Sequence, residues 1–166
     1  MIFDAVETCA AVALAHFEAD LAALCTAKGL AAAPSGWKVL AWHDAEDGVE
    51  LGSIEPLLGI TVSADASTQA KSQDRRESLT GVLFDAYIEH PEPTLLAQWI
   101  ALAPEAVMAT ADRLVAGIGG GVYGASVKSL STRIELSKGY EERGEQPMYW
   151  QRARVTVPVW DEDTGL

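Results

Sequence analysis

The segment 149–160 alternates in side-chain character over a dozen residues, and this period restricts the fold more than any other feature of the chain. A period of two matches a β-strand and does not fit one face of a helix. With the similar segment 130–140, it predicts a C-terminal hairpin that closes an antiparallel sheet. One set of alternate positions is Tyr149, Gln151, Ala153, Val155, Val157 and Val159. The opposite set is Trp150, Arg152, Arg154, Thr156, Pro158 and Trp160.

Further elements are expected from the spacing of apolar residues along the rest of the chain. Segment 2–28 predicts a helix, since apolar residues recur there at steps of three and four. Strands are expected at 37–42, 56–63 and 77–89. A second helix follows Pro93 and contains Pro104, so one kinked helix or two abutting helices fit equally well. The core face expected for the first helix is Phe3, Val6, Ala10, Leu14, Phe17, Leu21 and Leu24. The core face expected for strand 77–89 is Val82, Phe84, Ala86 and Ile88.

These elements predict a single α+β domain over residues 1–166. The expected architecture is a mostly antiparallel sheet of four to five strands, with the N-terminal helix and the Pro-interrupted helix packed on it. The segment ADASTQAKSQDRR has no aromatic and no large aliphatic residue. Such a segment cannot bury enough apolar surface to order itself, so a mobile loop is expected at about 64–76.

Charge and cysteine content exclude several classes of function. The net charge is −12, from 24 acidic and 12 basic residues. This balance disfavours sequence-specific binding of nucleic acid and docking on an anionic membrane. Cys9 and Cys25 fall in one predicted helix, about 24 Å apart at 1.5 Å per residue, which is too far for a disulfide. They are expected to be buried in a reducing compartment. The apolar run 9–17 is too short to cross a bilayer and has no basic leader, so we expect no membrane partner and synthesis in the cytoplasm.

No residue pattern predicts catalysis, a metal or a cofactor. The run Gly119–Gly124 matches the dinucleotide pattern G-x-G-x-x-G, but that motif needs a strand before it and a helix after it. Here it follows a predicted helix, so a helix stop is the better interpretation. The acidic segment 43–47 lacks calcium-loop spacing and is expected to be a solvated turn. Serine elbows and activated cysteines are also missing from the sequence. We therefore expect no catalytic residues, no metal site, no cofactor and no enzyme activity.

A group of basic and aromatic residues is the candidate interaction site. It consists of Arg75, Arg76, Arg133, Trp150, Arg152 and Arg154. Two interpretations stay open: a charged solvent face that protects a sheet edge, or a contact patch between proteins. On either interpretation the arginines point away from the core. We therefore expect Val155→Asp to be strongly destabilising and Arg152→Asp to be mild.

In the order of its elements, the chain resembles the tail terminator proteins of long-tailed bacteriophages, the family that includes the phage lambda terminator. The resemblance covers nearly the whole chain and has no short signature motif. The matching features begin with the N-terminal helix. In chain order, the segments after it are PLLGITVS, the long polar segment, ESLTGVLFDAYIEHPEP, a helix that begins TLLAQWIALAP, and the hairpin IELSKGYEERGEQPMYWQRARVTVPVWDED.

The resemblance implies a structural, ring-forming virion protein that caps the tail tube and joins it to the head. Its partners would be further copies of itself, as a hexamer, the tail tube protein and a head-completion or neck protein. DNA would pass through the ring, and the protein would be located in the tail–neck region of the virion. Three alternatives stay open: another head–tail connector or tail-completion protein, a small nucleotide- or ligand-binding enzyme domain that uses Gly119–Gly124, and a regulator of a bacterial host.

Overall fold

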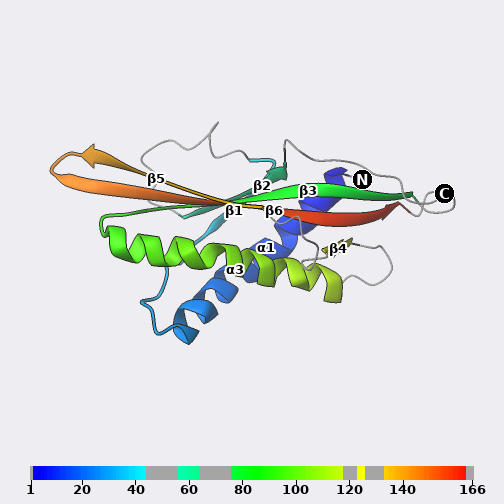
Figure 1. Cartoon of the computed structure of the whole chain (residues 1–166), viewed down its shortest axis with the longest axis horizontal. Coiled ribbons are helices and arrows are strands. Elements are labelled where there is room, and N and C mark those ends of the chain that lie inside the picture. The colour runs from blue at the N-terminus through cyan, green and yellow to red at the C-terminus, as the bar shows by residue number, and fades with distance from the viewer. Residues whose placement is uncertain (1, 44–55, 64–75, 118–122, 126–132, 164–166) are drawn as a thin grey trace.

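A computed structural model describes residues 2–43, 56–63, 76–117, 123–125 and 133–163. The chain order is helix, three strands, helix, three strands, which confirms the α+β class (Figure 1). The expected turn at 43–47, except His43, and the expected mobile loop, except Arg76, lie outside the described residues. The elements are α1 (Ile2–Ala27), β1 (Lys38–Ala41), β2 (Leu57–Val62), β3 (Arg76–His90), α3 (Pro93–Gly117), β4 (Tyr123–Ala125), β5 (Arg133–Arg143) and β6 (Gln146–Asp163).

The strands form one mixed sheet with the order β1-β2-β3-β6-β4, and β5 also pairs with β6. All pairs are antiparallel except β1 and β2, which run parallel. The expectation of a mostly antiparallel sheet is therefore confirmed. The short strand β4 brings the described sheet to six strands, one more than expected. Strand β6 is its centre, since β3 lies along one side of it and both β5 and β4 lie along the other.

Both helices cover the same side of the sheet, and the core lies between these two layers (Figure 1). The alternating faces expected for β3 and β6 are confirmed, because the inward positions are fully buried. On β3 and β6 these buried residues are Val82, Phe84, Ala86, Ile88, Ala153, Val155, Val157 and Val159. On α3 they include Leu96, Ile100, Ala103, Val107, Ala111 and Leu114.

Helix α1 buries part of the expected face, since Val6, Phe17 and Leu21 are buried. The rest of its buried stripe differs and includes both cysteines: Ala5, Cys9, Ala13 and Cys25. Phe17 fixes this orientation by an edge-to-face contact with Trp37, with ring centroids 5.0 Å apart. Leu14 is consequently turned outward and is 70% exposed. The expected core position of Leu14 was therefore wrong, because alanine and cysteine, rather than leucine, line the contact.

Helix α3 is one continuous helix that contains Pro104, and this decides between the two arrangements that the sequence left open. It is tied to α1 by an ion pair between Arg113 and Asp20, 2.6 Å from Nη2 to Oδ1. The indole of Trp99 donates a hydrogen bond of 3.0 Å to the carbonyl of Ala31. These contacts hold the two helices and the segment before β1 together as one layer.

The cysteines are buried and unpaired with each other, as expected. Burial raises the pKa of the Cys9 thiol to about 12, so this thiol is neutral at physiological pH. The complete N-terminal helix is longer than the apolar run 9–17 and is not too short for a bilayer. Ala5–Ala27 and Pro93–Leu114 both have the length and hydropathy of a membrane span, a property shared with core helices of soluble proteins. In this structure both helices pack on the sheet.

Candidate interaction surfaces

A buried ion cluster lies on the side of the sheet that faces away from the helices. Asp85 of β3 is 1% exposed and sits between the core residues Phe84 and Ala86 in sequence. Arg152 of β6 donates to it through Nε, 2.7 Å from Oδ1, and through Nη2 to Oδ2. Arg154 donates a third hydrogen bond of 3.3 Å. The antiparallel register places Asp85 opposite Arg154, so one carboxylate lies within reach of both arginines.

Trp150 lies on the same face and is held across three strands. Its ring stacks on Tyr87 of β3, with centroids 6.0 Å apart and an interplanar angle of 24°. On the other side it covers Gly139 of β5, its register partner. A Cβ atom placed on Gly139 would lie only 2.4 Å from the indole. The indole therefore fills the space that a side chain at Gly139 would occupy, which is a known way to stabilise glycine in a strand.

The structure brings together only part of the predicted basic group. Trp150, Arg152 and Arg154 share one face of β6, and Arg133 begins the adjacent strand β5. Arg133 is exposed and forms an ion pair with Glu135, 2.6 Å from Nη2 to Oε1. Arg76 begins β3 opposite Asp163, nine positions from Asp85. At about 3.3 Å per residue, its backbone lies roughly 30 Å from the ion cluster. Arg75 lies outside the described residues.

The geometry of the ion cluster contradicts the expectation that Arg152→Asp has only a mild effect on stability. The Arg152 side chain is 11% exposed and is paired with a carboxylate that is 1% exposed. An aspartate there would place two carboxylates together with little solvent. The two central arginines of the predicted patch therefore have partners within the chain, and the role of the patch in contacts between proteins stays a prediction.

Gly139→Val is expected to displace Trp150 and to destabilise the hairpin by about 1–3 kcal/mol, since a larger side chain would overlap the indole. Tryptophan fluorescence and urea unfolding measure the two effects. Gly144→Asn is the matched control in the turn after β5. Gly144 has a φ of +62°, which asparagine tolerates, and a Cβ atom at this position would meet no other atom within 4 Å. Unchanged fluorescence in Gly139→Val would contradict the packing described here.

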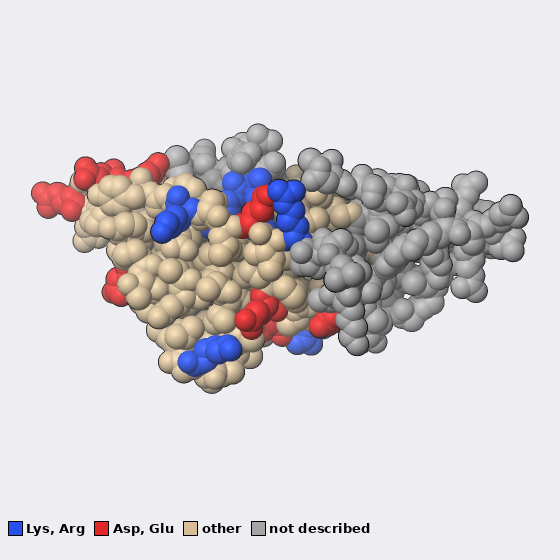
Figure 2. Space-filling view, in the orientation of Figure 1, with Lys and Arg blue, Asp and Glu red and all other residues tan. Residues whose placement is uncertain are grey.

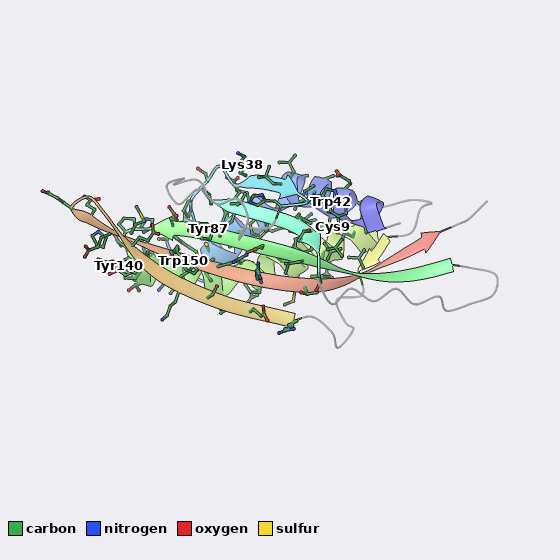
Figure 3. The ribbon with its side chains drawn as sticks, turned by 90° about the horizontal axis from the view of Figure 1, so that it is seen from above. Cys9, Lys38, Trp42, Tyr87, Tyr140 and Trp150 are labelled. Atoms are coloured by element: carbon green, nitrogen blue, oxygen red, sulfur yellow. The ribbon has the colours of Figure 1, made fainter. Side chains whose placement is uncertain are left out.

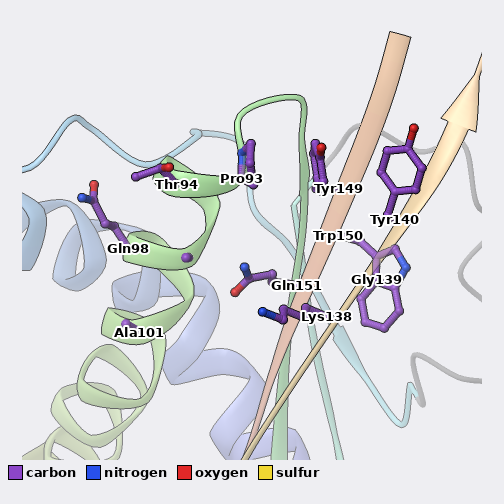
Figure 4. A pocket seen from close by; sticks show the side chains of 11 residues that line it. Pro93, Thr94, Gln98, Ala101, Lys138, Gly139, Tyr140, Tyr149, Trp150 and Gln151 are labelled. Carbon is purple, nitrogen blue, oxygen red and sulfur yellow. The ribbon is translucent and has the colours of Figure 1, made fainter.

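A groove of about 790 Å³ lies between the first half of α3 and the β5–β6 hairpin (Figure 4). Its helical wall consists of uncharged side chains, which include Thr94, Ala97, Gln98 and Ala101. Lys138 and Gln151 point from the strands toward α3 (Figure 4). Tyr140 and Tyr149 contribute aromatic rings, with centroids 5.1 Å apart. Figure 2 shows a broad uncharged area over α3 and the adjoining hairpin, with acidic side chains at the end of the hairpin.

Strand β5 forms one margin of this groove and is exposed along nearly its whole length. Residues 133–138 are exposed at every position, on both faces of the strand. Its helix-side positions include large apolar side chains: Ile134 is 44% exposed, Leu136 60% and Tyr140 49%. Their register partners on β6 include Val155 and Ala153, which are fully buried under the helices. The helix layer therefore ends at β6 and leaves β5 uncovered. We call Ile134, Leu136, Tyr140 and the groove the β5 surface.

A second apolar surface lies at the opposite edge of the sheet, where α1 meets β1. Leu14 is 70% exposed and Trp42 is 42% exposed. Glu7 accepts a hydrogen bond of 3.0 Å from the Trp42 indole, and Glu18 accepts one from the backbone of Gly36. Residues 7, 14 and 18 share one side of α1, so Leu14 faces the β1 edge. Figure 3 shows Trp42 at this edge and Tyr140 on the hairpin beyond the other. We call Leu14, Trp42 and the adjoining exposed face of α1 the α1 surface.

No family model and no curated protein matches this chain. Among the described residues there is also no group of three or more His, Cys, Asp or Glu side chains that could hold a metal ion. The end of the glycine motif is described: Gly124 lies in β4, opposite Trp160 of β6. A strand at that position does not supply the helix N-terminus that a dinucleotide phosphate needs.

Sequence reasoning missed the two apolar surfaces, because single exposed leucines and isoleucines look the same as core residues.

Proposed function

We propose that this chain is a ring-forming structural protein of a bacteriophage virion, a tail terminator that caps the tail tube and joins it to the head. The observation that carries the proposal is the position of the exposed apolar residues. All five large hydrophobic side chains that are exposed in the described structure lie on the β5 surface or the α1 surface. These two surfaces differ in composition and lie at opposite edges of one sheet.

Two different surfaces on opposite edges favour head-to-tail association. Such heterologous contacts produce a closed ring when the rotation between subunits closes, whereas a two-fold dimer uses one surface twice. Clusters of exposed apolar residues on a small domain are typical of contact sites. The resemblance of the element order to tail terminators supplies the hexamer, the tail tube and the neck as partners. Another head–tail connector would use the same ring geometry with a different neighbour.

The strongly acidic composition is compatible with a ring through which DNA passes. With a net charge of −12, the subunit as a whole repels phosphate. A ring of such subunits would let DNA pass without retaining it. The proposal requires no cofactor and no catalytic residue.

Immunogold electron microscopy tests the proposed location on virions of the phage whose genome encodes the chain. We expect label at the junction between tail and head, and nowhere along the tube. Label distributed along the tube would identify a tube subunit instead. Assembled virions that carry no label, although the chain is present in the infected cell, would contradict a structural role and favour a regulator of the host.

A further inference from the structure

Neither of the two helices in the described part of the chain covers the β5 surface, and the dimensions of helices and sheets explain why. A helix is about 10 Å wide and strands are about 4.8 Å apart, so one helix covers about two strands. Helix α1 packs on β1 and β2, and α3 packs mainly on β6 and β3. Strand β5 is next in the sheet, beyond the width that these two helices cover. A third helix beside α3 would bury Ile134 and Leu136.

Helix α1 has an uncovered outer face that fits this position. In the segment 8–27 its exposed residues are Leu14, Thr26 and six alanines: Ala11, Ala15, Ala19, Ala22, Ala23 and Ala27. Only 28% of the apolar window Ala5–Ala27 is buried, compared with 56% of the corresponding window in α3. The exposed side of this segment is therefore made almost entirely of apolar residues, whereas the solvent side of a surface helix is normally polar or charged. Alanine side chains let a neighbouring element approach closely, so aromatic rings such as Tyr140 can pack flat on this face.

One charge pairing is available between the two surfaces. Glu7 and Glu18 lie beside Leu14 on the α1 surface, and the sequence of α1 has no lysine or arginine. Among the residues that line the groove, the charged side chain is Lys138. A carboxylate-rich helix placed beside α3 would therefore bring Lys138 close to opposite charges. This gives the contact a preferred orientation in addition to its apolar area.

We propose that the β5 surface of one copy receives the α1 surface of a second copy, with Leu14 inserted between the groove and the exposed residues of β5. The contact continues the helix layer as α3 followed by the neighbour's α1. It also brings the outer edge of β1 in the second copy toward the outer edge of β5 in the first. The inference deepens the proposed ring function and rests on it, since it names the two surfaces that join successive subunits.

A mixing experiment with two single-surface variants tests the contact. Leu14→Asp disables the α1 surface, and Leu136→Asp disables the β5 surface. Both side chains are at least 60% exposed, so the fold should be retained, which circular dichroism and thermal unfolding check. Each variant alone is expected to be monomeric by light scattering. An equimolar mixture should give a dimer and no larger species, because one intact α1 surface and one intact β5 surface remain.

Cross-linking locates the contact in the native assembly. A Leu14→Cys protein mixed with a Leu136→Cys protein should form a disulfide-linked dimer under mild oxidation. The natural cysteines give a low background, since both are buried and Cys9 is held neutral. Thr26→Cys replaces Leu14→Cys as the control on the same helix, about three turns away. Equal cross-linking from Thr26→Cys would contradict the position assigned to Leu14.

The remaining outcomes separate this inference from the proposed function. If the wild type forms rings and both aspartate variants still do, the ring stands and the α1–β5 contact is wrong. If Leu14→Asp is monomeric but Leu136→Asp self-associates, α1 pairs with α1 and the head-to-tail contact is wrong. Flotation with phosphatidylcholine–phosphatidylglycerol vesicles tests a lipid surface as the occupant. Vesicle binding that Leu14→Asp abolishes, without any oligomer of the wild type, would overturn both proposals.

Discussion

Asp85→Ala is expected to lower the free energy of unfolding by about 3–5 kcal/mol, because it leaves Arg152 and Arg154 without their shared carboxylate in a poorly solvated site. Arg152 is 11% exposed and Arg154 is 23% exposed, so water can replace the lost partner only in part. Urea unfolding followed by circular dichroism measures the loss. A change below about 1 kcal/mol would show that the cluster is solvated and contributes as little as an ordinary surface ion pair.

The matched control for this prediction is Glu135→Ala, which removes the partner of Arg133 on β5. Those two side chains are 51% and 65% exposed, so the loss should be small. A second comparison replaces all three members of the buried cluster. Asp85→Leu combined with Arg152→Met and Arg154→Met should recover much of the stability lost in Asp85→Ala, since replacing buried ion pairs with apolar residues is often neutral. Additive losses would contradict the direct pairing of Asp85 with Arg152.

Val155→Asp is expected to prevent stable folding. Val155 is fully buried at the centre of β6, opposite Phe84 of β3 and beneath the helices. A carboxylate there has to be desolvated or neutralised, and either event costs several kcal/mol out of a total stability of about 5–15 kcal/mol. Circular dichroism and the yield of soluble protein measure the outcome.

Thr156→Asp is the control for the same strand and the same chemical change. Thr156 is half-buried, points to the other face of the sheet and lies opposite Arg133 of β5. An aspartate at that position stays partly solvated and can approach the Arg133 guanidinium, so only a small change is expected. Equal tolerance of aspartate at 155 and 156 would contradict the assignment of the two faces of β6.

The two long strands β3 and β6 were predictable because their signal is repetitive. Each alternates over many residues, so an error at one position does not change the assigned face. The strand β4 carries no such signal, since it has only three residues and follows a glycine run. The face of α1 was assigned only partly correctly, for the opposite reason: Val6, Phe17 and Leu21 are buried as expected, but Leu14 is exposed. That helix is apolar on nearly every side, so several stripes fit a helical period and the sequence does not choose among them.

The ion cluster could not be predicted because it depends on register. Asp85 and Arg152 are 67 residues apart, and only the pairing of β3 with β6 places them together. The sequence placed Arg152 and Arg154 correctly on the outward face of their strand. That face is not fully solvated, because Tyr87, Glu89 and Asp85 are also buried on it. Outward-facing and exposed are therefore different properties in this sheet.

The β5 and α1 surfaces were missed because a sequence pattern indicates the period of an element but not the extent of the layer that covers it. The alternation in 130–140 predicts a strand, and the structure confirms it for the described residues 133–140. Whether Ile134 and Leu136 are buried depends on how many helices pack over the sheet. The two described helices extend over the sheet as far as β6 and do not reach β5. The resulting exposure is a property of the assembled domain.

Light scattering after size exclusion gives the mass of the purified wild-type protein over a concentration series. Together with negative-stain images, it decides whether copies of the chain join into a ring. We expect a concentration-dependent rise from the 17.7 kDa monomer to a closed species of defined mass, seen as rings of about six subunits. A species that stays at the monomer mass at every concentration, with no rings in the images, would contradict the proposal that its exposed surfaces join copies of the chain.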